Sequence, residues 1–144
     1  MKTAHLLFTI LCLLCLLLSS MPLQDNTLEA SKLRGQKLYS GLCAGCHKPD
    51  GSGYTARKLS PPLANSDYLL KNKKNGIEVV LFGLKGKVIV NNVEYDRVMP
   101  PVDWTDQELS DVLNYVRNSW GNEAPFISPE EVAEIREVGK ESDK

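Results

Sequence analysis

The chain has 144 residues, of which 42% are hydrophobic and 24% are charged. This length suits one domain rather than two, and this balance is typical of a globular protein and excludes a disordered one. The formal net charge of −1 also excludes a broadly basic chain of the kind that binds nucleic acid.

The first twenty residues have the pattern of an export signal. Lys2 precedes the apolar run Leu6–Leu18, and small polar residues follow it. The run has the length of a signal-peptide core and is shorter than the roughly 20 residues that span a bilayer. We expect cleavage after Ser20 or Ala30, with an uncleaved N-terminal anchor as the alternative. Either way the sequence predicts export to the periplasm, with membrane attachment only if this segment is retained.

A helix is predicted over Leu28–Leu42, because Leu33, Leu38 and Tyr39 recur on one side of it. It leads directly into the first motif that carries chemistry.

That motif is Cys-x-x-Cys-His, formed by Cys43, Cys46 and His47. The other two cysteines, Cys12 and Cys15, lie inside the apolar run and leave with the signal. A structural zinc site needs four ligands, and the mature chain has no further Cys or His to supply them. A redox dithiol usually follows a strand, whereas a helix precedes this motif. The pattern is the signature of covalent haem attachment, in which both thiols bind the haem and the histidine binds its iron.

If a second protein ligand fills the sixth position of the haem iron, the protein is suited to electron transfer; if that position is open, it is suited to chemistry on oxygen or another small molecule. His5 lies in the predicted signal, so Met99 is the candidate ligand. Pro100 and Pro101 follow it and stiffen its loop. The competing interpretation is that Met99 only fills the core. An open sixth position would suit a haem enzyme or a gas or redox sensor, and a haem-free domain with a disulfide between the motif cysteines is a further alternative.

Between the two motifs the sequence predicts short elements. A short helix begins near Asn65 or Ser66, and another, with apolar residues from Ile77 to Leu84, ends at Gly86. Two β-prone arms flank Asn91 and Asn92, which tolerate the positive φ of a tight hairpin turn.

Two helices are predicted after the methionine loop. Thr105 and Glu108 form a capping box for a helix that stops near Gly121. Ser128 caps one more short, polar helix. We therefore divide the chain into a signal peptide or anchor (1–20), a linker (21–29), one domain (30–121) and a polar C-terminal extension with a short helix (122–144).

The order of these elements resembles class I cytochrome c over about residues 30–121. The stretches GQKLYSGLCAGCH, PPLA, VNNVEYDRVMPP and LSDVLNYVRNSWGN look like those of its small bacterial members. The resemblance implies a mainly α fold wrapped around one haem c, with a small β-hairpin before the methionine loop. It also implies that His47 and Met99 are axial ligands and that the Pro61 carbonyl accepts a hydrogen bond from His47.

The resemblance carries two further expectations. Gly35 and Tyr39 of the first helix should cross Tyr115 of the last helix. Family members serve as free carriers or as domains of oxidases, dehydrogenases and nitrite reductases. The chain is therefore expected to transfer electrons between exported redox proteins and not to be an enzyme.

Charge is distributed unevenly along the chain. Residues 31–99 hold twelve Lys and Arg against five Asp and Glu, a net +7, and residues 103–144 hold four against eleven, a net −7. Because an exposed haem edge is where electrons leave, we expect a basic rim around it that steers an acidic partner. The candidate residues are Lys71, Lys73, Lys74, Lys85 and Lys87.

Overall fold

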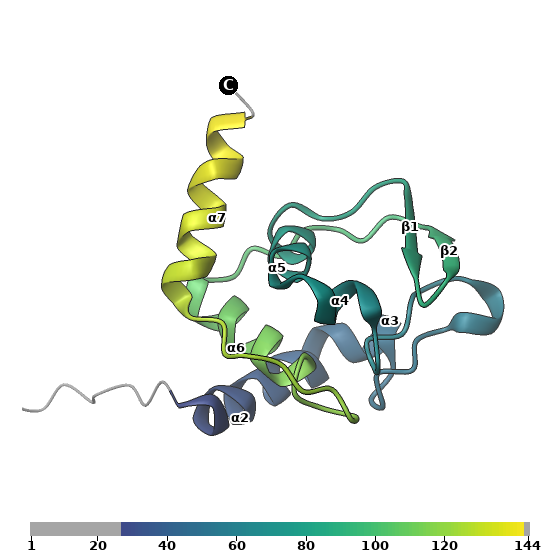
Figure 1. Cartoon of the computed structure of the whole chain (residues 1–144), viewed down its shortest axis with the longest axis horizontal. Helices are drawn as coiled ribbons and strands as arrows, with labels where there is room; N and C mark the ends of the chain where they lie inside the picture. Colours follow the sequence, from purple (N-terminus) through teal and green to yellow (C-terminus); the bar gives the residue numbers. More distant parts are fainter. Residues whose placement is uncertain (1–26, 143–144) are drawn as a thin grey trace, which may run out of the picture.

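The computed structural model describes residues 27–142, so the predicted signal segment lies outside the described residues. The described chain is mainly helical and contains a two-stranded antiparallel sheet (Figure 1). Within it, no helix combines the length and the apolar character needed to cross a bilayer. This architecture confirms the predicted fold class.

The first helical segment has three parts. Helix α2 covers Leu28–Leu38, a single π-helical turn covers Tyr39–Cys43, and α3 covers Ala44–His47. Thr27 caps α2 by accepting a hydrogen bond from the backbone N–H of Ala30. The predicted helix is therefore present and starts at Leu28 as predicted, but its last turn is widened where the cysteine motif begins.

The elements after the motif are short. A 3₁₀ turn covers Thr55–Arg57, α4 covers Asp67–Lys71 and α5 covers Lys73–Phe82. Ser66 caps α4 through its side chain, which confirms the predicted start of this helix near Asn65 or Ser66. Helix α5 ends before Gly83, whose φ of 78° breaks the helix, so the predicted end at Gly86 is wrong.

The hairpin is confirmed. Strand β1 covers Lys87–Val90 and pairs with β2, Val93–Asp96. Asn91 and Asn92 between them have φ angles of 51° and 61°, the left-handed values that a two-residue hairpin turn requires.

Helix α6 covers Asp106–Val116, and the capping box between Thr105 and Glu108 is formed in both directions. The helix ends before Arg117, earlier than the predicted stop near Gly121. Helix α7 then covers Pro129–Ser142. It has 14 residues and is longer and less polar than the sequence suggested, because one face buries Val132 completely.

Helices α2 and α6 cross at the position that the resemblance implies. A Cβ added to Gly35 would lie 1.9 Å from the backbone oxygen of Asp111 and 2.9 Å from Cβ of Tyr115, so only glycine allows this close approach. The ring of Tyr39 lies 5.4 Å from that of Tyr115 and 5.0 Å from that of Trp120. This crossing fixes the start of the cysteine motif relative to α6.

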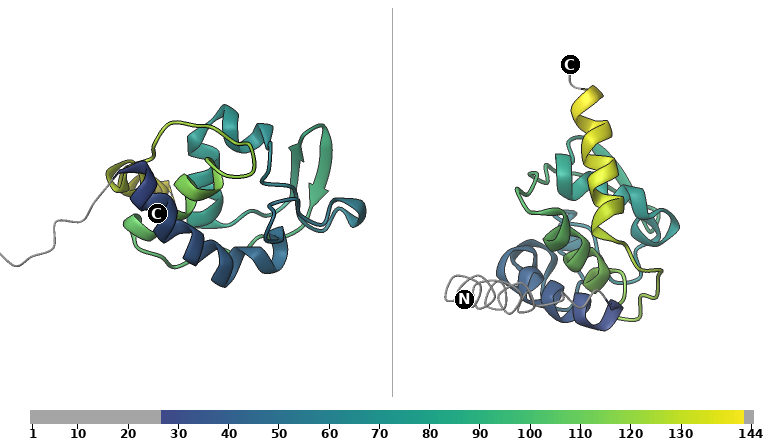
Figure 2. Two further views of the ribbon diagram at one scale, coloured as in Figure 1. Left: turned by 90° about the horizontal axis from the view of Figure 1, so that it is seen from below. Right: turned by 90° about the vertical axis from the view of Figure 1, so that its left-hand side faces the viewer.

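Helix α7 lies against α5 and α6 and extends beyond them, at the end of the molecule away from the hairpin (Figures 1 and 2). The hydrophobic core joins all the long helices of the described chain, and α7 contributes to it. Its fully or nearly fully buried members are Tyr39, Leu69, Ile77, Leu81, Leu109, Val112, Leu113, Val116, Ile127 and Val132.

Candidate haem site

The cysteine motif lies where α2 passes through its π turn into α3. Cys43 and Cys46 are free thiols, with Cys43 half-buried and Cys46 exposed. Burial, and secondarily the neighbouring Cys46, raises the pKa of the Cys43 thiol to about 11. Both cysteines line the same cavity as His47, so the motif presents its three reactive groups to one space.

The imidazole of His47 is held in one orientation. Its Nδ1 lies 3.0 Å from the carbonyl oxygen of Pro61. A carbonyl can only accept, so Nδ1 carries the proton and Nε2 keeps its lone pair. The side chain is buried, and burial lowers its pKa although the bond to Pro61 opposes that shift. A neutral imidazole with an unprotonated Nε2 is the form that binds iron.

Three further hydrogen bonds hold the backbone around the motif. The Ser60 hydroxyl donates to the carbonyl of Cys46 (2.6 Å), and the Gly53 N–H donates to the carbonyl of His47 (3.0 Å). The Tyr39 hydroxyl donates to the carbonyl of Lys48 (2.5 Å). Sequence reasoning missed the role of Ser60, because nothing in its local pattern marks a contact 14 residues away.

The cavity itself is lined almost entirely by apolar side chains. Cofactor pockets are typically lined by apolar side chains with a few placed polar groups. Residues from the motif, the proline loop, α4, α5, the hairpin, the methionine loop and α6 contribute to the lining. Its aliphatic walls are Leu59, Leu63, Leu69, Val79, Val80, Leu84, Val88, Val90, Val98, Val102, Val112, Leu113 and Val116.

Met99 reaches this cavity from a loop that is tied to the end of α5. Its backbone N–H and C=O exchange hydrogen bonds with Leu84 at 2.9 and 2.8 Å. Three residues later the N–H of Val102 donates to the carbonyl of Val80 (2.9 Å). A Cβ on Gly83 would lie 2.7 Å from the Met99 carbonyl oxygen, so the two segments touch without a side chain between them. These contacts position the thioether, and they are not visible in the local sequence.

The donor set fits a haem. Cys43 and Cys46 provide two thiols for covalent attachment, and His47 and Met99 provide an imidazole nitrogen and a thioether sulfur. These are the ligand types that haem iron accepts. Pro61 orients the imidazole, and the apolar walls would surround a macrocycle. The structure thus brings together every residue that the sequence singled out for haem binding.

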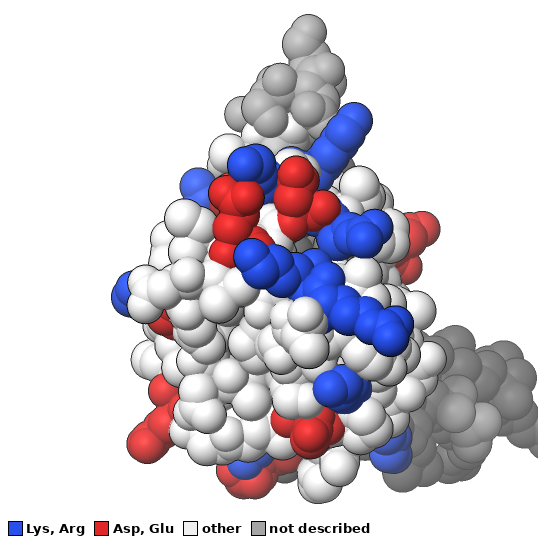
Figure 3. Space-filling model, turned by 90° about the vertical axis from the view of Figure 1, so that its right-hand side faces the viewer, with Lys and Arg blue, Asp and Glu red and all other residues white. Residues whose placement is uncertain are grey.

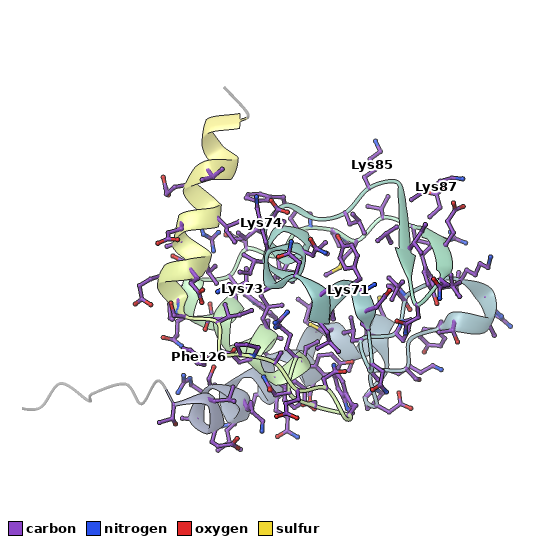
Figure 4. The ribbon with its side chains drawn as sticks, viewed as in Figure 1. Lys71, Lys73, Lys74, Lys85, Lys87 and Phe126 are labelled. Atoms are coloured by element: carbon purple, nitrogen blue, oxygen red, sulfur yellow. The ribbon has the colours of Figure 1, made fainter. Side chains whose placement is uncertain are left out.

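The five predicted rim lysines come from separate elements, with Lys71 on α4, Lys73 and Lys74 on α5, and Lys85 and Lys87 at the start of the hairpin. Figure 4 shows them spread from α5, beside α7, to the hairpin. Four of them are paired with carboxylates: Lys71 with Asp67, Lys73 with Glu131, Lys74 with Glu78, and Lys87 with Glu94. For Lys85 the described structure shows no ion pair.

The face that carries the hairpin has a mixed surface. In Figure 3 basic and acidic side chains lie next to each other in its upper part, and uncharged surface covers much of the rest. Ile89 and Val98 are among its exposed apolar residues, at 62% and 68% exposure. This face therefore combines basic, acidic and apolar surface.

Comparison with known proteins identifies a family. The model of the cytochrome c family matches residues 33–120. Cytochrome c-552 of Thermus thermophilus is 33% identical over 120 residues, which cover 76% of this chain and 78% of that protein. The region matched by the family model contains the cysteine motif, the methionine loop and α6, and it ends before the C-terminal extension.

Other relatives are parts of larger proteins. The cytochrome c subunit of the quinone alcohol dehydrogenase of Gluconobacter oxydans is 33% identical over 110 residues, which cover 73% of this chain and 22% of that subunit. The cytochrome c subunit of gluconate 2-dehydrogenase of Pantoea cypripedii is 33% identical over 107 residues, which cover 71% of this chain and 24% of that subunit. The chain thus spans about a quarter of each of these subunits.

Proposed function

Because the chain belongs to the cytochrome c family, and is thus an electron-transfer protein with covalently bound haem c, we propose how its residues hold that haem. Cys43 and Cys46 form the two covalent links, and His47 and Met99 are the axial ligands of the iron. The observation that carries this proposal is that all four side chains line one apolar cavity. The bound haem supplies an iron that gains and loses one electron.

The surrounding residues set the properties of that iron. The carbonyl of Pro61 keeps the proton of His47 on Nδ1, which leaves Nε2 for the metal. The Met99 thioether favours reduced iron, and the apolar walls that exclude water act in the same direction. With two protein ligands on the iron, no position is left for a substrate. We therefore propose a carrier or electron-transfer subunit without catalytic activity of its own.

The spectrum of the purified protein tests this assignment. We expect the pyridine haemochrome of a c-type haem, and in the ferric protein the near-infrared band that a methionine–iron bond produces. A c-type haemochrome without that band would leave the covalent attachment standing and refute Met99 as the ligand.

The proposed partner is another redox protein. The relatives include cytochrome c subunits of dehydrogenases, which supports a dehydrogenase, and an oxidase or reductase would serve equally as the other partner. We propose that residues 1–20 direct the chain to the periplasm, as a cleaved signal or as an anchor. We propose residues 30–121 as the electron-transfer domain and 122–144 as an extension of it.

The docking surface that we propose contains only some of the lysines of the predicted basic rim. Lys85 lies just before β1 and Lys87 is the first residue of that strand, which lines the cavity through Val88 and Val90. Lys87 is paired with Glu94 at 3.0 Å, but both side chains are at least half exposed and remain available to a partner. Lys73 pairs instead with Glu131 of α7, so we assign it to holding the extension and not to docking.

We expect Lys85→Glu combined with Lys87→Glu to lower the rate at which the protein reduces an anionic oxidant such as ferricyanide. The expected decrease is several-fold, because charges at the rim of a docking surface mainly affect the association rate. Raising the ionic strength from about 0.01 M to about 0.1 M shortens the screening length from about 30 to about 10 Å and should lower the wild-type rate. Stopped-flow absorbance measures both effects.

Lys32→Glu is the control for a charge reversal far from the hairpin, because α2 starts at the end of the molecule away from the hairpin (Figure 1). It should leave the rate nearly unchanged. A double variant that reacts as fast as the wild-type protein at low salt would mean that docking is apolar.

A further inference from the structure

The C-terminal extension lies beyond the region that the cytochrome c family model covers, yet it is built into the domain. The hydroxyl of Ser110 and the amide of Asn114 donate to the carbonyl of Ile127 at 2.7 and 2.9 Å, and Asn114 accepts from the Ile127 N–H at 2.8 Å. All three residues are fully buried. The start of α7 is thereby fixed against α6, which makes the helix a rigid part of the fold.

Helix α7 contacts both ends of α5. Glu131 in its first turn pairs with Lys73 at the start of α5. Near the other end of α7, Gly139 lies against Phe82, where an added Cβ would come within 2.2 Å of the phenylalanine ring. Phe82 is the last residue of α5, two residues before Leu84, the backbone partner of Met99. The helix thus supports the side of the methionine loop that α5 forms.

A second set of contacts reaches the other end of the methionine loop. Arg136 donates from Nη2 to the carbonyl of Trp104 (2.7 Å) and from Nε to Oδ1 of Asp106 (2.8 Å). The two charged side chains are only 23% and 35% exposed, so water competes weakly for these bonds. Trp104 lines the haem cavity and packs on the core. One guanidinium therefore closes the loop that begins at Met99, at the point where the loop enters α6.

We propose that α7 is a brace for the methionine loop and that Arg136 is a positioning residue that sets how readily Met99 leaves the iron. The inference rests on the proposed function, since it takes Met99 as the axial ligand. The loop has two anchors, the Leu84 and Val80 backbone at its start and Arg136 at its end. An external ligand reaches the iron only when the loop opens, so its apparent affinity is proportional to the open fraction. Releasing one anchor raises that fraction.

Binding of imidazole to the ferric holoprotein measures the open fraction. We expect Arg136→Gln to lower the apparent Kd for imidazole about tenfold, which corresponds to about 1.4 kcal/mol, because it removes the charged fork. Arg136→Lys keeps the charge but cannot span both acceptors, so its Kd should lie between those of the wild-type protein and Arg136→Gln. Truncation after Ser128 removes the whole brace and should lower the Kd further.

Glu134→Gln is the matched control on the same helix. Glu134 is exposed, and its carboxylate accepts no hydrogen bond from the described residues. Its Kd should equal that of the wild-type protein. An equal fall in Kd for Glu134→Gln and Arg136→Gln would mean that any change in α7 loosens the loop, and it would overturn the specific role of Arg136.

Met99→Ala separates failure of the brace from failure of the ligand assignment. If Met99→Ala binds imidazole much more tightly than the wild-type protein while Arg136→Gln and the truncated protein do not, Met99 is the ligand and α7 is no brace. If the wild-type protein already binds as tightly as Met99→Ala and lacks the near-infrared band, the ligand assignment itself is wrong. Should the truncated protein not yield holoprotein, Arg136→Gln alone decides.

Discussion

Protein in which Cys43 and Cys46 are both replaced by alanine is expected to contain almost no covalently bound haem. The two thiols are the groups through which haem c is attached, and without them only axial ligation and apolar contacts hold the cofactor. Each single replacement should lower the yield sharply. Haem staining of a denaturing gel, normalised to the amount of protein, measures the effect.

The chain provides its own control for this experiment. Replacing Cys12 and Cys15 by alanine changes the same number of cysteines within the predicted export signal, and covalent haem should remain at the wild-type level. Normal haem staining from the Cys43→Ala, Cys46→Ala protein would refute the attachment site.

The same double variant should also be poorly folded. The cavity is lined by side chains from the cysteine motif to α6, and most of them are apolar. Without haem these walls face water or collapse, and each Å² of apolar surface left exposed costs about 25 cal/mol. Because a ligand that binds only the folded state stabilises it, we expect a broad unfolding transition by circular dichroism in place of a cooperative one.

The second large effect is expected from Met99→Ala. The haem should remain covalently attached, because both cysteines are intact. The reduction potential should fall on the order of 0.2 V, a fraction of the roughly 0.8 V over which axial ligands shift haem potentials. The vacated position should bind cyanide in the ferric state and carbon monoxide in the ferrous state. Redox titration and absorbance spectra measure these changes.

Met99→Leu distinguishes ligation from packing. Leucine restores most of the lost volume but offers no sulfur, so a ligand role predicts that Met99→Leu and Met99→Ala share the lowered potential. Ile89→Ala changes an apolar residue of β1 that is 62% exposed and does not line the cavity, so it should leave the potential unchanged. If Met99→Leu kept the wild-type potential and spectrum, Met99 would be a packing residue, and the haem enzyme or sensor with an open sixth position would become the better interpretation.

The sequence by itself determined the features that depend on neighbouring residues. The cysteine motif is a five-residue pattern, the capping box of α6 joins Thr105 to Glu108, and the hairpin turn needs two residues that accept positive φ at Asn91 and Asn92. Each of these patterns lies within a few neighbouring residues, so it can be recognised without knowing the tertiary structure. Met99 was the candidate left once His5 was assigned to the signal, and the family resemblance added Gly35 and Pro61, whose partners lie further along the chain.

Only the tertiary structure decided the features that join distant segments. The length of α7 and its buried face, the pairing of Lys73 with Glu131 across 58 positions, and the contacts of Arg136 with Trp104 and Asp106 have no local pattern. The lysines were predicted from sequence proximity to be one basic rim, but folding separates them and places carboxylates beside four of them. Which charges lie side by side, and how a ligand side chain is oriented, depends on where distant segments lie in space. Long-range packing sets these positions, and local propensity does not specify them.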